Sequence, residues 1–217
     1  MNKKMKITFI CLEMLLYVTF LSMDLIGEFS SLVKFAGICL CFMAALLIAC
    51  RGRKKDNYYM LLIMTLTMLA DVFLLLTSGA YLVGVLLFCL VQTLYALRLQ
   101  QWGGKSAWIL RGAILIVVWI ILKMIGALDA LSMAAAYSFV QLTLNAVLAV
   151  RLKLGKKRAA FAVGLVLFWG CDFCVGLHNI MGYLPAFPWP WLLTAASFGM
   201  WLFYLPAQVL LVLSTEI

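Results

Sequence analysis

The sequence predicts an all-α membrane protein that crosses the bilayer eight times, and three observations lead to this prediction. The 217 residues are 67% hydrophobic with a mean hydropathy of +1.12, well outside the range of soluble domains. Only 12% of the residues are charged, and these residues lie in short clusters. The apolar runs between the clusters are about 18 to 22 residues long, which is the length that a helix needs to cross a bilayer.

Each apolar run is expected to form one transmembrane helix. The connections between the runs are short, so residues 1–217 should form a single transmembrane domain without a separate soluble domain. In chain order we expect helices at about 6–23, 30–50, 59–77, 80–99, 108–125, 129–150, 159–179 and 191–213.

The basic residues set the expected orientation of these helices. They precede the first run and fill the links after the second, fourth and sixth runs, at 3–6, 51–55, 98–111 and 151–158. Only Lys34 and Lys123 fall toward the other side of the membrane. The positive-inside rule therefore predicts that both termini lie in the cytoplasm. The net charge of +9 then needs only anionic lipid headgroups as partners, and we expect no nucleic acid.

Four ionisable residues interrupt the apolar runs, away from their cytoplasmic ends: Glu13, Lys34, Asp71 and Asp172. Each costs about 2.5 to 3.5 kcal/mol or more near the bilayer centre, so such groups face the bundle interior and usually mark a functional site. A structural alternative is that Lys34 neutralises one carboxylate or reaches toward the membrane surface. Because one lysine cannot pair with three carboxylates, a functional role of these groups is favoured over the structural alternative.

Polar residues at helical spacing surround these ionisable groups in several of the predicted helices. A polar face inside a bilayer must look inward, so these stripes predict a polar cavity. The members of the stripes are Thr67 with Asp71, Gln92 with Tyr95, Gln141 with Asn145, Asp172 with Asn179, and Tyr204 with Gln208.

The two aspartates are expected at similar depths in the membrane. Asp71 and Asp172 lie at corresponding positions of the third and seventh runs, and in both cases the following run carries Gln and Tyr. This correspondence indicates a weak four-plus-four repeat in parallel orientation. Two carboxyl groups on equivalent helices can act as a general acid and a general base.

Five motifs follow one another along the chain: Lys34-Phe35, Ala70-Asp71 before VFLLL, GVLLFCLVQTLY with Gly84, Phe88, Gln92 and Tyr95, LFWGCD ending at Asp172, and FYLPAQVLL with Tyr204 and Gln208. In this order and spacing, the stretch from Lys34 to Ser214 resembles the YhhN-like integral membrane proteins, whose animal members are lysoplasmalogenases. The chain departs from that family at three positions. The family has Pro after the lysine, where this chain has Phe35, and Gly before the first aspartate, where this chain has Ala70. The family has His where this chain has Gln92. Gln92 can form hydrogen bonds but cannot carry protons near neutral pH.

The resemblance implies hydrolysis of the vinyl ether of a lysoplasmalogen, which gives an aldehyde and a glycerophospho head group. Protonation of the remote alkene carbon makes the vinyl ether electrophilic, and water then adds to the carbon that bears oxygen. One carboxylic acid can give the proton and one carboxylate can activate the water. Lys34 could hold one aspartate ionised or bind the substrate phosphate. The sequence leaves open which aspartate acts as the acid.

We therefore expect a hydrolase of ether lysolipids, integral to a membrane and multi-pass, in the plasma membrane of a bacterium. Asp71 and Asp172 are the expected catalytic residues. The expected substrate-binding residues are Lys34, Gln92, Tyr95, Tyr204 and Gln208. The cavity is expected to include Glu13, Thr67, Gln141, Asn145 and Asn179.

Other function classes are less consistent with the sequence. His178 is the single histidine, so a zinc site built from several histidines is excluded, and we expect neither a metal nor a cofactor. The alternative from a different class is a non-enzymatic membrane protein, namely a small-solute or proton-coupled transporter or a lipid-binding sensor. Intramembrane carboxylates and a parallel repeat are also typical of transporters.

Overall fold

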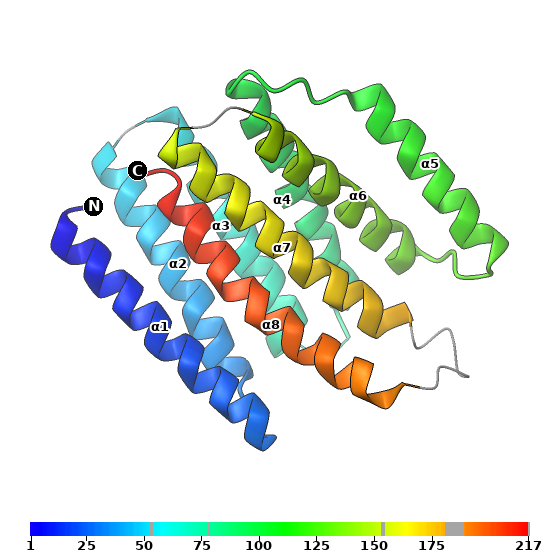
Figure 1. The fold of residues 1–217 in the computed structure, drawn as a ribbon, viewed down its shortest axis with the longest axis horizontal. Helices are drawn as coiled ribbons and strands as arrows, with labels where there is room; N and C mark the ends of the chain where they lie inside the picture. The colour runs from blue at the N-terminus through cyan, green and yellow to red at the C-terminus, as the bar shows by residue number, and fades with distance from the viewer. Residues whose placement is uncertain (53, 78, 153–154, 181–188, 217) are drawn as a thin grey trace.

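The described part of the chain folds into eight α-helices and one short π-helix, and it contains no strand (Figure 1). This computed structural model describes residues 1–52, 54–77, 79–152, 155–180 and 189–216. In chain order the helices are α1 (Lys3–Ile26), α2 (Ser31–Gly52), α3 (Lys55–Asp71), the π-helix η1 (Val72–Leu76), α4 (Tyr81–Gln101), α5 (Trp108–Met124), α6 (Ala130–Arg151), α7 (Lys156–Ile180) and α8 (Pro190–Leu213). The predicted all-α class is confirmed, and every predicted helix agrees with an observed one to within about one turn.

Seven segments among the described residues are long and apolar enough to cross a membrane. These segments lie in α1, α2, α3 with η1, α4, α6, α7 and α8. Helix α5 is shorter, with 17 residues. The set of spans is that of a multi-pass membrane protein. The cytoplasmic position of the termini and the four-plus-four repeat stay predictions.

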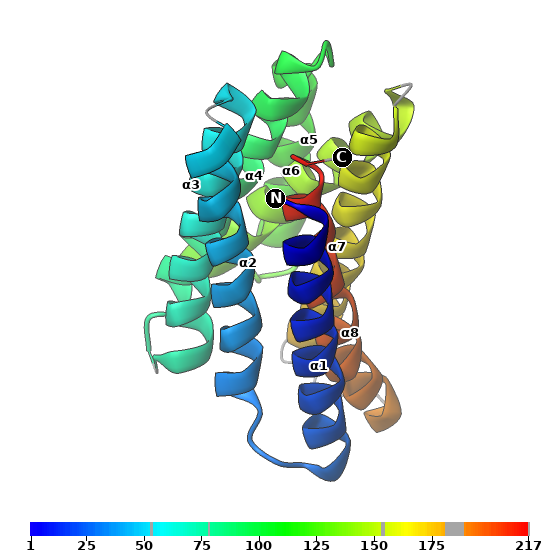
Figure 2. The same cartoon turned by 90° about the vertical axis from the view of Figure 1, so that its left-hand side faces the viewer.

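Six of the helices form a closed ring. Each helix packs against the next in the order α2, α3, α4, α6, α7 and α8, and α8 returns to α2. Helix α1 covers the seam between α2 and α8, whereas α5 packs on α6 at the opposite edge of the bundle (Figures 1 and 2). Because a polar group inside a bilayer needs a partner in the protein, the inside of this ring is where polar side chains can gather.

Both chain termini lie at the same end of the bundle, which we call the terminal end (Figure 2). The Met1 amino group forms an ion pair with the Glu216 carboxylate there. The links from α2 to α3, from α4 to α5 and from α6 to α7 also lie at this end, since successive helices run in opposite directions. These are the links that carry the basic residues.

Small residues allow the ring helices to approach closely. A Cβ atom at Gly84 of α4 would lie 2.6 Å from Leu74 Cγ of η1 and 3.1 Å from the Ala70 carbonyl oxygen. A Cβ atom at Gly37 of α2 would lie 2.9 Å from Leu205 of α8. Glycine at such crossings is typical of helix packing in membranes. At Gly84 it lets α4 pack directly against the turn that follows Asp71.

Candidate functional site

The candidate site is centred on Asp71, the last residue of α3. The side chain is only 3% exposed. Directly after it the backbone changes from α-helix to the π-helix Val72–Leu76, which widens the last turns of this segment. Short π-helical segments occur frequently at functional sites, because the extra residue redirects the side chains around it. Both the burial of Asp71 and the π-helix that follows it therefore indicate a functional site at this residue.

Tyr204 of α8 holds the Asp71 carboxyl group. The Tyr204 hydroxyl donates a hydrogen bond of 2.7 Å to Asp71 Oδ2 across the ring. The other oxygen, Oδ1, has no hydrogen-bond partner among the described residues. Asp71 therefore has one oxygen fixed by the protein and one oxygen available to a bound molecule.

Aromatic rings surround the Tyr204 side chain. Its ring lies 5.7 Å from that of Phe168, 6.4 Å from that of Phe88 and 5.5 Å from that of Trp201, all edge-on. Phe88 and Phe168 also contact each other, with ring centroids 5.8 Å apart. The tyrosine hydroxyl that bonds to Asp71 is thus positioned by packing against aromatic rings.

A group of uncharged polar side chains lies on the terminal side of Asp71, and we call it the polar column. Its members come from α3, α4, α6 and α8, and each is 0% exposed: Thr67, Gln92, Tyr95, Asn145 and Gln208. Thr67 Oγ1, Tyr95 OH, Asn145 Oδ1 and both amide atoms of Gln92 and Gln208 have no hydrogen-bond partner among the described residues. One bond within the column is formed, from Asn145 Nδ2 to the Gln92 carbonyl oxygen, at 2.8 Å.

Asp172, the second predicted catalytic carboxyl group, has a different environment. It is half-buried in α7 and forms no hydrogen bond to any other described residue. It lies within electrostatic range of Tyr81 and Cys89, which places it on the side of α7 that faces α4. Cys171 lies within electrostatic range of both Asp172 and Asp71, but no hydrogen bond or ion pair among the described residues joins the two carboxyl groups directly.

Lys34 is placed near the end of the bundle opposite the termini, and its partner is Asp24. The Lys34 ammonium group lies 2.9 Å from Asp24 Oδ1, and Ser30 donates a hydrogen bond to the same oxygen. The ammonium group also lies 4.5 Å from the centroid of the Trp201 ring. Lys34 is therefore paired with a carboxylate that the sequence analysis did not consider as its partner, and Trp201, which it contacts, packs in turn against Tyr204.

Three predicted cavity residues lie outside the polar column. Glu13 is 3% exposed in α1, and its Oε1 accepts a hydrogen bond from the Cys41 thiol of α2. Gln141 accepts a hydrogen bond from Arg111, near the start of α5. Asn179 is exposed near the end of α7 and donates to the Val175 carbonyl oxygen. The structure thus brings Asp71, Tyr204 and the polar column together, but not these three.

Arg98 is the residue of this region that sequence reasoning missed, since it was expected in a basic link. It is 0% exposed and donates two hydrogen bonds of 2.8 Å to the Asp56 carboxylate. It donates a third bond, of 3.1 Å, to the Ser214 hydroxyl. The guanidinium group also lies 4.5 Å from the Trp102 ring centroid and 4.7 Å from that of Phe161. Arg98 follows Tyr95 by three residues and therefore lies on the same face of α4. This spacing was the sequence signal that could have indicated that Arg98 faces the interior.

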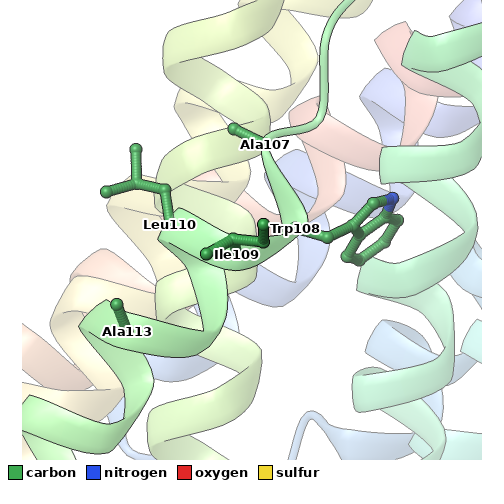
Figure 3. A pocket seen from close by; sticks show the side chains of 5 residues that line it. All are labelled: Ala107, Trp108, Ile109, Leu110 and Ala113. Atoms are coloured by element: carbon green, nitrogen blue, oxygen red, sulfur yellow. The ribbon is translucent and has the colours of Figure 1, made fainter.

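One hollow on the surface lies at the start of α5, where Trp108 contacts the Arg111 guanidinium group. It is lined by apolar side chains at the start of α5: Ala107, Trp108, Ile109, Leu110 and Ala113 (Figure 3). Ile109 is 92% exposed there, as expected of a side chain that faces lipid. The hollow offers no acid, base or nucleophile, so it does not compete with Asp71 as a candidate site. No group of three possible metal ligands occurs among the described residues.

The comparison with protein families agrees with the motifs that surround Asp71 and Tyr204. The sequence model of the YhhN family matches residues 11–215, which is nearly the whole chain, so the protein belongs to the YhhN family. Comparisons with curated proteins and with solved structures gave no match.

Proposed function

From this family membership and the environment of Asp71, we propose that the protein hydrolyses the vinyl ether of lysoplasmalogen-type lysolipids inside the helix ring. The observation that carries the proposal is the Asp71 carboxyl group itself. It is 3% exposed, it has one oxygen bonded by Tyr204, and its other oxygen has no protein partner among the described residues. A carboxyl group in this position can exchange a proton with a bound lipid.

The proposed reaction needs one proton donor, one proton acceptor and one water molecule. The donor carboxyl group protonates the alkene carbon remote from the ether oxygen, which leaves an oxocarbenium ion. Water adds to the carbon that bears oxygen while the acceptor carboxylate takes its proton. The hemiacetal then breaks into the fatty aldehyde and the free hydroxyl of the glycerophospho head group. One proton is given and one is taken, so the pair returns to its starting charge.

The aromatic rings around Tyr204 suit the charge that develops during this reaction. An oxocarbenium ion carries positive charge, and aromatic faces attract cations. Phe88 and Phe168 lie beside Tyr204 and offer such faces. The same rings can hold the apolar chain of the lipid. The amide groups of Gln92 and Gln208 can bond to hydroxyl groups of the glycerol.

Asp172 is our proposed second carboxyl group, and Lys34 our proposed contact to the phosphate. Asp172 has no bonded partner among the described residues, so it is free to act on water or on the lipid. Lys34 is already paired with Asp24, so a substrate phosphate would have to share or displace that carboxylate. Tyr95 belongs to the same proposed lining. We place the protein in a bacterial plasma membrane, with its basic links against anionic lipid headgroups.

The test is release of aldehyde from purified protein given a lysoplasmalogen, with the ester-linked lysolipid of the same head group as the control substrate. Asp71→Asn should lower the rate by about 10² to 10⁴, because the amide can neither give nor take a proton at neutral pH. Asp129→Asn is the matched control. Asp129 caps α6 at its N-terminus, and asparagine is an equally good cap, so this variant should keep its activity. Absence of aldehyde from the unaltered protein would overturn the proposal.

A transporter or a lipid-binding sensor is the second candidate, and the polar column is the observation that favours it. Buried polar groups that extend along the bundle are typical of ion pathways. A transporter must also open the site to both sides of the membrane. Arg98 with its partners Asp56 and Ser214 joins α3, α4 and α8 at the terminal end, and this connection supports a site closed at that end. Uptake of labelled solute into proteoliposomes, without aldehyde release, would favour the transporter.

A further inference from the structure

The polar column carries more unbonded hydrogen-bonding groups than helix packing explains. Its five side chains, Thr67, Gln92, Tyr95, Asn145 and Gln208, are all 0% exposed. Seven of their polar atoms have no protein partner among the described residues, and four of these are the amide atoms of the two glutamines. Buried polar groups in folded proteins are nearly always bonded to protein or to ordered water. In a bilayer the surrounding lipid offers no partner.

The members of the column are arranged in order along the bundle. Thr67 lies one turn from Asp71, and Gln208 lies one turn from Tyr204, both toward the terminal end. On α4, Gln92 is followed by Tyr95, which lies within electrostatic range of Tyr204. From Tyr204 to Ser214 the distance along α8 is about 15 Å, given a rise of 1.5 Å per residue. The column therefore extends from the Asp71 site toward the terminal end of the bundle.

Arg98 closes the column at that end. It lies one turn beyond Tyr95 on α4, within electrostatic range of the Tyr95 hydroxyl. Its guanidinium group is bonded on three sides by Asp56 and Ser214. It is also covered by the rings of Trp102 and Phe161. The column is thus bounded by a carboxyl group at one end and by a bonded guanidinium group at the other.

We propose that the polar column is a binding site for a chain of water molecules that connects Asp71 with the Arg98 end of the bundle. Buried water molecules bind where two to four otherwise unbonded polar groups meet, and the hydroxyl and amide groups of the column offer both donors and acceptors. Under the proposed hydrolysis, the chain holds water beside Asp71, where one molecule is consumed in each reaction. The binding of water itself rests only on the unbonded groups, whereas its use in hydrolysis rests on the proposed function.

Radical footprinting of the full chain in lipid nanodiscs tests this directly, with no substrate present. Ionising pulses produce hydroxyl radicals from bound water as well as from bulk water, so a fully buried side chain is modified only where water is bound beside it. Tyr95 should be modified at a rate closer to that of Tyr58, which is 51% exposed, than to that of Phe20, which is 0% exposed. Modification of Tyr95 as slow as that of Phe20 would overturn the proposal.

A pair of threonine variants gives a second, independent test. Thr67→Val removes a hydroxyl group that has no protein partner among the described residues. If the hydroxyl binds water, the variant should lower the melting temperature and slow the modification of Tyr95. If the hydroxyl has no partner at all, valine should raise the melting temperature or leave it unchanged, which would contradict the proposal.

Thr65→Val is the matched control on the same helix. The Thr65 hydroxyl donates 2.8 Å to the Leu61 carbonyl oxygen of its own helix, so its removal should not affect Tyr95. Equal slowing of Tyr95 modification by Thr65→Val and Thr67→Val would assign the effect to general loosening of α3 and would reject the water chain. Because both readouts are made without substrate, their failure leaves the hydrolase proposal intact. A missing hydrolase activity likewise leaves the water chain intact.

Discussion

Tyr204→Phe is the sharpest test of the candidate site, since it removes one oxygen atom. The lost hydroxyl group donates the 2.7 Å hydrogen bond to Asp71 Oδ2. The phenyl ring that remains can keep its edge-on contacts with Phe88, Phe168 and Trp201. The variant therefore separates the bond to Asp71 from the packing that positions it.

The expected loss follows from the strength of that bond. A hydrogen bond to a charged or strongly polarised group is worth about 1.5 to 3 kcal/mol. If this energy positions Asp71 in the transition state, the rate of aldehyde release should fall about 10- to 150-fold, since 1.36 kcal/mol corresponds to a factor of ten. In an Asp71→Asn background the same change should have almost no further effect, because the two side chains act as one unit.

The assay is aldehyde release at saturating and at limiting lysolipid, with melting temperature measured on the same samples. Tyr17→Phe is the matched control, because the Tyr17 hydroxyl also bonds to α8, at 2.9 Å to the Leu202 carbonyl oxygen, but away from Asp71. It should lower stability to a similar degree and leave the rate unchanged. An unchanged rate in Tyr204→Phe, or an equal fall in Tyr17→Phe, would refute the assignment of Tyr204 as the residue that positions Asp71.

Three further predictions concern the Arg98–Asp56 ion pair at the terminal end, Gln92 in place of the family's histidine, and the crossing of α4 with η1 at Gly84. Asp56→Asn should destabilise the protein by about 2 to 4 kcal/mol in chemical unfolding, because Arg98 is fully buried and loses its charged partner, whereas Asp56 itself is partly exposed. Gln92→His, which restores the residue that the family carries, should raise aldehyde release and make it depend on pH between about 5 and 8; a rate that is flat across this range would exclude proton transfer at this position. Gly84→Ala should lower the melting temperature, whereas Gly112→Ala, where a Cβ atom meets nothing within 4 Å, should keep or raise it.

The helices could be predicted from the sequence because the same physical requirement applies to each of them. An apolar run of bilayer length must satisfy its own backbone hydrogen bonds, so charge clusters and run lengths locate its ends. The bounds of α4, predicted at 80–99 and observed at Tyr81–Gln101, show this agreement. The π-helix Val72–Leu76 could not be predicted in this way, because hydropathy does not distinguish a π-helical turn from an α-helical one.

The candidate site was only partly predictable for a related reason. Helical spacing places Thr67 with Asp71 and Tyr204 with Gln208 on shared faces, and the structure brings these four residues together in one ring. Spacing says nothing about which partner a long side chain selects across the bundle. Lys34 was therefore considered as a partner of the central carboxylates, although Asp24 lies nearer to it. Long side chains need tertiary structure before their partners can be named.

The two predicted catalytic aspartates have unlike surroundings, and this difference is what an acid–base pair requires. Under the predicted repeat, Asp71 of α3 and Asp172 of α7 would occupy equivalent positions, each followed by a helix with Gln and Tyr. Asp71 is enclosed and bonded by Tyr204, whereas Asp172 is half-buried and has no bonded partner among the described residues. Paired carboxyl groups take separate roles when their environments differ. If the predicted repeat is present, divergence at the Tyr204 contact would give two equivalent aspartates the separate roles of proton donor and proton acceptor that the proposed hydrolysis needs.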